Sequence, residues 1–463
     1  MPSTIPTRDR QHVPAATWPL LALFVGYPLW WALGIGQFAY WIFAVPMMWL
    51  LIRMHRERPG GLRLPPGAWI WALFLVWAVA GLPLLGLGPS ATLAEGASYL
   101  GALTRLVNYL VLTVILLYVG NLGRDVLSDR KMAGLLGWLG LVTVAGGLLG
   151  TFAPTFEFTS PVEMLLPTQL ATDSYVQALL RPASAQIMDV LGYEAARPKA
   201  PWEYTNAWGN NLSLLLIWLV IGWLCLGARW QRWTAGIALG LAVIPVVQSL
   251  NRALWLGLAL SLAFAAHQLI RRGHLRAVLA ACLATTLVAA AVLASPLRDT
   301  IAERVGNPHS DAGRAAASTA AVQAASESPL LGWGSTRDVQ GSSDSIAIGQ
   351  SPDCPQCGNN TIGNNGQLWL LLVAHGWLGA ALFLGFFAQA AWRFRGDTSL
   401  VGRGALLTIL LLFWYMLFYV SMLAPLATTM IAVALLWRRA EQRNAEQNHG
   451  GRAGAGHNQE KVS

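Results

Sequence analysis

Residues 366–391 read GQLWLLLVAHGWLGAALFLGFFAQAA, a run of mostly apolar side chains without a single charged residue. A helix that crosses a bilayer needs about 20 such residues, because hydrocarbon offers no hydrogen-bond partner to an unpaired amide. Comparable runs recur along most of the chain. The run predicts a membrane-spanning helix, and its repetition predicts an integral membrane protein of the all-α fold class.

The composition of the whole chain agrees with this interpretation. Of its 463 residues, 55% are hydrophobic and only 11% are charged, and the mean hydropathy is +0.48. A soluble domain would carry about 25% charged residues. Apolar runs of suitable length predict about twelve transmembrane helices, at 18–35, 37–54, 68–88, 98–121, 132–153, 209–227, 232–250, 252–270, 275–296, 366–391, 401–420 and 423–438.

Positive charge is distributed unevenly along the chain. The formal net charge of +9 would suit a nucleic-acid-binding protein, but most basic residues fall in alternate short loops between the predicted helices. Cytoplasmic loops of membrane proteins are enriched in Lys and Arg in this way. The pattern argues against nucleic acid as a partner, and it predicts a multi-pass protein with both termini in the cytoplasm. These loops hold Arg53, Arg56, Arg58, Arg63, Arg124, Arg130, Lys131, Arg229, Arg232, Arg271, Arg272, Arg276, Arg393, Arg395, Arg403, Arg438, Arg439 and Arg443.

This topology divides the chain into three groups of helices, which are separated by two long outer loops. A polar, Gly-rich C-terminal tail has too few apolar side chains to order itself, so we expect disorder there. The predicted segments are a cytoplasmic tail (1–17), helices one to five (18–153), a first extracytoplasmic loop (154–208), helices six to nine (209–296), a large extracytoplasmic loop (297–365), helices ten to twelve (366–438) and a disordered cytoplasmic tail (439–463).

Five arginines stand out by position. Arg252, in VVQSLNRALWLGL, and Arg105, in ASYLGALTRLVNYLVL, lie in or at the outer ends of predicted spans, where an isolated ion costs about 3 kcal/mol or more. Arg197, Arg304 and Arg314 lie in the outer loops. Each could snorkel to headgroups or form a structural ion pair. The planar guanidinium also binds phosphate oxygens with two hydrogen bonds, so the set predicts an outward-facing diphosphate site.

A polar and aromatic cluster opens the sixth predicted span. The sequence YTNAWGNN places Asn206, Trp208 and Asn210 at this entrance. Carboxamides donate to and accept from sugar hydroxyls, and an indole ring can stack on a sugar. The alternative is an interfacial Trp beside a helix-capping Asn.

Two cysteines in the large outer loop are separated by only two residues. The spacing of Cys354 and Cys357 suits half of a zinc site, a redox pair or a small disulfide loop. An oxidising outer face favours the disulfide. No second Cys or His cluster lies nearby in the sequence to complete a metal site.

Several motifs together resemble one protein family. SLNRALWLGL, RVGNPHSDAGRAAAS followed by SPLLGWGS, and NNGQLWLLLVAHGWLGAALFLGFF occur in the order seen in bacterial O-antigen ligases and O-antigen polymerases. RPKAPWEYTNAWGNN is similar to the approach to a span in some relatives. The resemblance covers about 197–390. It implies a membrane glycosyltransferase of the C-type fold, located in a bacterial plasma membrane.

The resemblance also implies a reaction. Such an enzyme moves a glycan from a polyprenyl diphosphate carrier to a hydroxyl of a glycan or lipid acceptor, without metal or other cofactor. Its partners would be that donor, that acceptor and membrane lipids. Carried over by motif, Arg252 and Arg314 would form the catalytic pair that binds the donor diphosphate and stabilises it as the leaving group.

The chain departs from the family pattern at one position. Where the family has a His before the closing span, this chain has Asn364 and Asn365. We expect these residues to contact substrate, but Asn cannot act as a base at neutral pH. Either positioning alone suffices, or another group accepts the proton, with Asp311, Glu203 and His309 as candidates.

Two further alternatives stay open at the level of sequence. Ligase and polymerase differ only in acceptor, which leaves no readable signature. A transporter or flippase of anionic lipids would also combine many spans with buried arginines, although such proteins tend to show internal repeats, and none is visible here.

Overall fold

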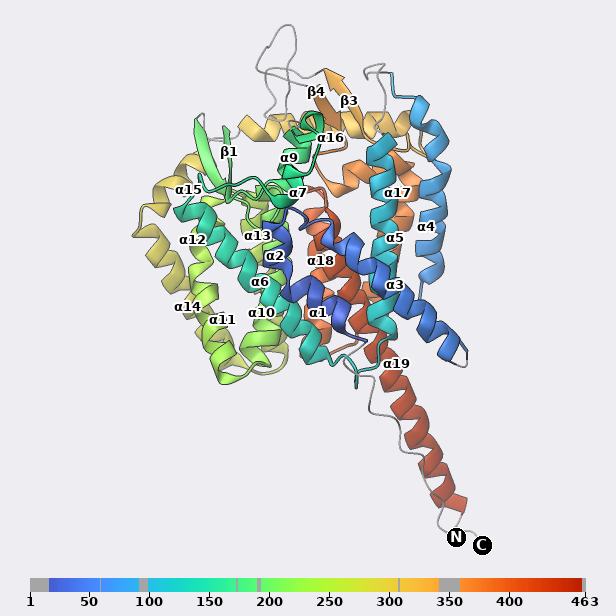
Figure 1. The fold of residues 1–463 in the computed structure, drawn as a ribbon. Helices are drawn as coiled ribbons and strands as arrows, with labels where there is room; N and C mark the ends of the chain where they lie inside the picture. The colour runs from blue at the N-terminus through green and yellow to red at the C-terminus, as the bar shows by residue number, and fades with distance from the viewer. Residues whose placement is uncertain are drawn as a thin grey trace.

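The computed structural model describes residues 16–58, 60–90, 99–171, 174–189, 193–306, 309–340 and 359–459. Almost all regular structure in this part of the chain is helical, and the two exceptions are short β-hairpins. The protein is therefore an all-α membrane protein in outline, with small β elements in its long loops (Figure 1).

Among the described residues, nine helical segments are long and apolar enough to cross a membrane. Their lengths, from 19 to 28 residues, match the thickness of bilayer hydrocarbon. They are α4 (Ala68–Ala80) with η2 (Leu82–Gly86), α5 (Tyr99–Asn121), α6 (Asp129–Phe152), α10 (Thr205–Leu219) with η3 (Val220–Cys225), α11 (Arg229–Leu241) with α12 (Val243–Gln248), α13 (Arg252–Arg271), α14 (Leu275–Leu293), α17 (Gln367–Phe394) and the first 22 residues of α19 (Leu423–Gln459).

The remaining predicted spans are shorter or broken helices. The predicted pair 18–35 and 37–54 corresponds to α1 (Trp18–Val25), α2 (Tyr27–Ala32) and α3 (Ala39–Glu57), while 401–420 corresponds to α18 (Leu400–Tyr415). Pro19 and Pro28 lie in the first turns of α1 and α2, where proline is tolerated. Each predicted span thus falls on a helix, and the number that cross a membrane stays a prediction for these three regions.

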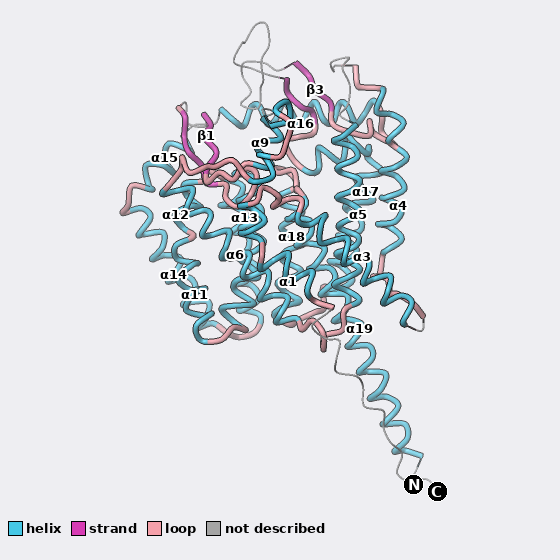
Figure 2. Tube along the Cα trace, in the orientation of Figure 1, coloured by secondary structure: helices cyan, strands magenta, loops and turns pink. Residues whose placement is uncertain are grey.

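The helices pack as one bundle with two distinct ends (Figure 2). α10 packs against α6 and α18, and α19 packs against α5 and α18, so α10 and α19 lie at the centre. α13 and α14 lie at the edge, where few of their side chains are buried. We call the end that carries the β-hairpins the loop end, and the opposite end, from which α19 projects, the tail end (Figure 1).

Both long loops lie at the loop end. The first contains α7 (Pro161–Met164), α8 (Thr168–Ala171), α9 (Ser174–Leu180) and an antiparallel hairpin of β1 (Ala185–Asp189) with β2 (Glu194–Pro198). The second contains α15 (Leu297–Gly306), α16 (His309–Glu327) and an antiparallel hairpin of β3 (Arg337–Gln340) with β4 (Asn359–Ile362).

The PLLGWGS segment (329–335) docks into a break in α17. Gly376 has φ +68° and interrupts the helix, which leaves backbone groups available to the loop. The amides of Trp333 and Gly334 donate to the carbonyls of Val373 and Ala374 at 2.8 and 2.9 Å. A Cβ at Gly332, whose φ is +66°, would lie 2.5 Å from the Gly376 nitrogen. This part of the motif therefore has a packing role.

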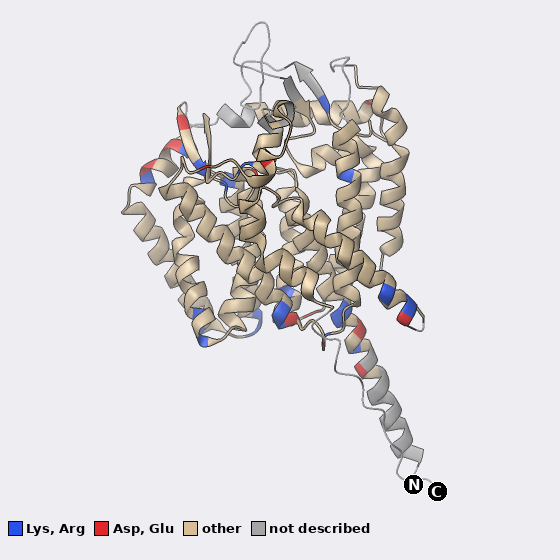
Figure 3. Cartoon of the chain, viewed as in Figure 1, with Lys and Arg blue, Asp and Glu red and all other residues tan. Residues whose placement is uncertain are grey.

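The predicted basic loops gather at the tail end (Figure 3), where carboxylates pair with several of the arginines. Asp129 pairs with Arg438 and Arg439 at 2.5 Å, and Asp397 pairs with Arg439 at 3.0 Å. These contacts join α6, the α17–α18 turn and α19. The tail end is thus both the basic end and a point where three segments are tied together.

Candidate functional site

A cavity of about 910 Å³ lies at the loop end of the bundle. Its wall is built from both long loops and from the ends of α5, α10, α13, α17 and α19. All five arginines singled out from the sequence line it, and they are the only charged residues among the described residues of its wall: Arg105, Arg197, Arg252, Arg304 and Arg314.

Two of these arginines are fixed by consecutive carbonyls of the turn between α12 and α13. Arg197 Nε donates to the Ser249 carbonyl at 2.6 Å, and Arg304 Nε donates to the Leu250 carbonyl at 3.0 Å. The two arginines are only 8% and 7% exposed. Burial, with smaller contributions from Arg304 and Arg314, lowers the pKa of Arg197 to about 10, so its charge persists at neutral pH.

The same turn contains a residue in an uncommon backbone conformation. Leu250 has φ +54° and lies in the left-handed region, which costs a non-glycine residue about 1–2 kcal/mol. Its carbonyl holds Arg304, and the next two residues, Asn251 and Arg252, face the cavity. The turn thus keeps a strained conformation at the point where it presents polar groups.

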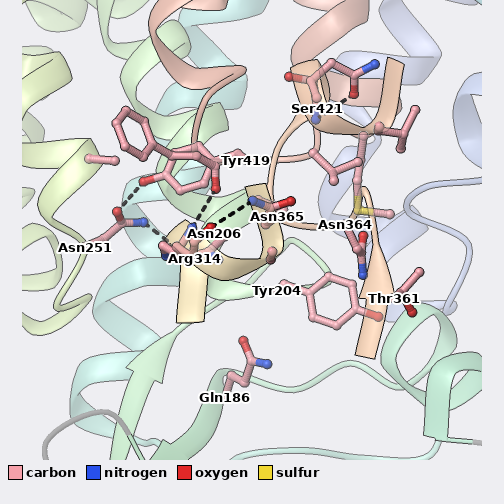
Figure 4. A pocket seen from close by; sticks show the side chains of 18 of the residues that line it. Gln186, Tyr204, Asn206, Asn251, Arg314, Thr361, Asn364, Asn365, Tyr419 and Ser421 are labelled. Atoms are coloured by element: carbon pink, nitrogen blue, oxygen red, sulfur yellow. Dashed lines mark hydrogen bonds between the residues drawn. The ribbon is translucent and has the colours of Figure 1, made fainter. Parts of the chain in front are cut away.

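Asn251 connects three elements beside Arg252. Its side chain caps α13 by accepting from the Leu254 amide at 3.3 Å and also accepts from the Tyr419 hydroxyl. Its Nδ2 lies 3.5 Å from the Asn206 Oδ1 of α10. Figure 4 shows Asn251, Tyr419 and Asn206 turned toward one another at one wall of the cavity. This network fixes the first turn of α13, where Arg252 is the first residue.

Arg314 reaches the cavity from α16. Its Nη1 donates to the Phe418 carbonyl at 3.1 Å. Asn365 Nδ2 lies 3.5 Å from the Arg314 carbonyl (Figure 4) and donates to Ser318 Oγ, one turn further along α16, at 2.8 Å. Phe418 belongs to the non-helical segment 416–422 between α18 and α19. Irregular backbone at the mouth of a bundle is tolerated where it lines a polar cavity, and here it supplies an anchor for Arg314.

Arg105 approaches from a different side, on α5. Its Nη1 and Nη2 donate to Ser335 Oγ and Thr336 Oγ1 at 2.7 and 2.9 Å. The docked PLLGWGS segment therefore ends by holding a cavity arginine.

The ends of four helices add to the positive potential. α10, α13, α17 and α19 each have residues of their first turn in the cavity wall. A helix N-terminus carries roughly half a positive charge and presents unpaired amides, so it favours an anion. Helix ends and arginines together make this an anion-binding environment.

The rest of the polar wall consists mainly of carboxamides and hydroxyls. Both groups form hydrogen bonds with neutral, hydroxyl-rich molecules. They are Gln37, Asn108, Gln186, Asn206, Asn251, Asn364, Asn365 and Gln367, with Thr104, Tyr109, Tyr204, Thr361, Tyr419 and Ser421. No group of three His, Cys, Asp or Glu side chains that could hold a metal occurs among the described residues.

Comparisons with protein-family models, curated proteins and solved structures find no match to this chain.

Most residues that the sequence predicted for the site do lie in the cavity wall, namely the five arginines with Asn206, Asn364 and Asn365. Trp208 and Asn210 do not. Trp208 is fully buried, with Nε1 donating to the Thr143 carbonyl of α6 at 3.0 Å, and Asn210 is 2% exposed. α10 begins at Thr205, earlier than the predicted start at 209, so Trp208 already contacts α6 and both residues are buried within the bundle. Their burial corrects the prediction that Trp208 and Asn210 contact a sugar.

Asn251 and the segment 416–422 were not predicted as part of the site. Tyr419 and Ser421 follow an apolar run that reads as a simple span, and Phe418, Val420 and Met422 also line the cavity. The available signal was the pair of polar side chains just before Pro425, at a predicted span end.

Of the three candidate bases, only Glu203 has a side chain within the described part of the chain. Glu203 is buried beside Lys199 and is not part of the described cavity wall, and burial raises its pKa to about 7. The side chains of His309 and Asp311 lie outside the described part of the chain, as do Cys354 and Cys357. The disulfide therefore stays a prediction.

Proposed function

We propose that this protein is a membrane glycosyltransferase that moves a glycan from a polyprenyl diphosphate carrier to a hydroxyl of an acceptor. The observation that carries the proposal is the gathering of five arginines, from segments far apart in the sequence, around one cavity. A diphosphate is a compact anion with several terminal oxygens, and guanidinium forks bind such oxygens in pairs.

The other polar groups support a glycan beside the diphosphate. Eight carboxamides line the same cavity, and a carboxamide is able both to donate to and to accept from hydroxyls. An inorganic anion alone would not need acceptors of this kind. The wall thus suits a ligand with a charged part and a hydroxyl-rich neutral part.

The proposed chemistry needs no covalent intermediate. The acceptor oxygen attacks the anomeric carbon, the bond from that carbon to the diphosphate oxygen breaks, and the acceptor proton passes to a base or to the departing diphosphate. Negative charge grows on the leaving diphosphate. Arg252, at a helix N-terminus, and Arg314 would stabilise it, because cations fixed before the reaction lose little energy to reorganisation.

The topology forms part of the proposal. With the basic tail end in the cytoplasm of a bacterium and the loop end outside, the cavity would open to the outer face of the plasma membrane. The α1–α2 pair, α3 and α18 would complete twelve spans, with both termini inside.

The main alternative is a transporter or flippase. A transport site must be reachable from each side in turn, whereas the described wall of this cavity is built from the two long loops and from the parts of the helices that adjoin the loop end. That one-sided placement favours a transferase. Ligase and polymerase share the donor site, so both acceptors fit the proposal.

A transfer assay tests the proposal. Purified protein in liposomes is given a glycan on undecaprenyl diphosphate and a panel of glycan and lipid acceptors, with and without EDTA. We expect transfer to a hydroxyl acceptor and release of undecaprenyl diphosphate, unchanged by EDTA. Movement of intact donor across the bilayer without bond cleavage would favour the flippase, and loss of turnover in EDTA would contradict the metal-independent chemistry.

A further inference from the structure

One face of α13 changes from charged to apolar within a single turn. Arg252 and Leu256 lie four residues apart, so they share a face, and both line the cavity. Leu256 is also 54% exposed, and Leu260, one turn further, is 46% exposed. The cavity wall at Leu256 therefore continues onto the apolar outer surface of the bundle.

Aromatic side chains of the neighbouring segment face this transition. Trp414 Nε1 donates to the Ala253 carbonyl at 3.1 Å and ties α18 to the first turn of α13. The Trp414 and Phe418 rings lie 5.0 Å apart, and Phe418 lines the cavity while its carbonyl holds Arg314. The apolar surface of α13 thus begins beside Arg252, and that of Trp414 and Phe418 begins beside Arg314.

This arrangement suits an amphiphile rather than a soluble anion. A free diphosphate needs only the polar cavity. The hydrocarbon tail of a lipid-linked diphosphate must also extend from the cavity into the membrane by a route that keeps it out of water. The outer face of α13 supplies such a route, because little of this helix is buried in the bundle.

We propose that the α13–α18 boundary, formed by Ala253, Leu256, Trp414 and Phe418, is a lateral portal through which the isoprenoid tail of the donor passes into the membrane. The inference rests on the proposed function for the identity of the donor. It adds the direction in which the lipid lies, with the diphosphate at Arg252 and Arg314 and the tail along Leu256 and Leu260.

Binding measurements test the portal without requiring turnover. Purified wild-type protein and Leu256→Asn protein are titrated with undecaprenyl diphosphate and with inorganic pyrophosphate. We expect the substitution to weaken binding of the lipid about tenfold, as loss of one buried leucyl contact would, and to leave pyrophosphate binding unchanged. Leu256→Ala, which stays apolar, should give a smaller loss of lipid affinity and guards against misfolding by the Asn variant.

Leu262→Asn is the matched control, because Leu262 is 52% exposed on the same helix and does not line the cavity. Its affinity for both ligands should equal that of the wild type. Equal lipid affinities in the Leu256 and Leu262 variants, or parallel loss of lipid and pyrophosphate binding at Leu256, would overturn the portal. Transfer is assayed on the same preparations, so wild-type protein that binds the lipid through Leu256 and transfers no glycan would reject the proposed reaction alone.

Discussion

Arg314 is held by a backbone carbonyl rather than by a carboxylate among the described residues, so its charge can act on a ligand. Arg314→Ala and Arg252→Ala should each lower the rate of transfer about a hundredfold or more, the usual effect of removing one preorganised group that stabilises a transition state. Arg314→Lys should recover only part of the rate, since an ammonium lacks the planar fork.

The control for these variants is Arg298→Ala, because Arg298 is exposed on α15 and lies outside the cavity wall. Rates are measured with saturating donor, and folding is checked by size-exclusion chromatography. Near wild-type transfer by both the Arg252 and Arg314 variants would remove them from the active site.

Glu203 should make the stability of the protein depend on pH. Burial raises its pKa from 4.5 to about 7, while Lys199 opposes the rise. The folded state then keeps a proton that the unfolded state releases, so stability falls as pH rises from about 4.5 to 7 and stays lower above that range. Glu203→Gln cannot ionise, so at pH 8 the variant should melt at a higher temperature than the wild type. The corresponding gain in the free energy of unfolding is at most roughly 3 kcal/mol.

At pH 5 the difference between Glu203→Gln and wild type should largely vanish. Thermal melts in detergent at the two pH values measure it. An equal difference at both would mean that the glutamine acts through packing alone.

Single residues were predictable where their chemistry conflicts with their surroundings. Arg105 and Arg252 stand out in the sequence because a guanidinium in an apolar run is costly, and both line the cavity. Trp208 carries no such conflict, since an indole near a span end suits a sugar, an interface or a core equally. Its burial depends on where α10 begins, and helix ends are the least predictable feature of a sequence.

At the scale of elements, the docking of PLLGWGS into α17 depends on Gly332 in the loop and on Gly376 at the break in the helix. A Cβ at Gly332 would meet backbone atoms of α17 at about 2.5 Å and would also have to adopt φ +66°. Gly332→Ala should therefore destabilise the protein by more than about 2 kcal/mol, and it should also lower transfer because Arg105 is held by the end of this segment.

Gly236→Ala provides the comparison, since nothing lies within 4 Å of a Cβ added at that position of α11. Alanine is favoured over glycine inside a helix, so this variant should melt at or slightly above the wild-type temperature. Equal melting temperatures for both variants would contradict the close packing at Gly332.

Most helices were predictable from apolar length, because each must satisfy its own backbone groups in the membrane. The break at Gly376 was not, since an uninterrupted apolar run hides it. The long-range contacts that fill the break come from a loop some 40 residues earlier in the chain, and local sequence carries no record of such a partner.

At the scale of the whole molecule, Asp129 ties the tail end together. It pairs with Arg438, and the two side chains are 6% and 4% exposed. Removing one partner of a buried pair leaves an uncompensated charge, so Asp129→Asn should destabilise the protein by about 3 kcal/mol or more. The ion pair of Glu57 with Arg53 is exposed, and Glu57→Gln should change the melting temperature little. Similar melting temperatures for the two variants would contradict the network.

In the proposed reaction the arginine cavity binds the diphosphate of a lipid. The most direct measurement is the affinity of the purified protein for undecaprenyl diphosphate, undecaprenyl phosphate and undecaprenol. We expect the diphosphate to bind at least about tenfold more tightly than the monophosphate, the effect of one further charge-assisted hydrogen bond of roughly 1.5 kcal/mol, and Arg314→Ala to abolish that preference. Equal affinity for all three lipids would contradict the claim.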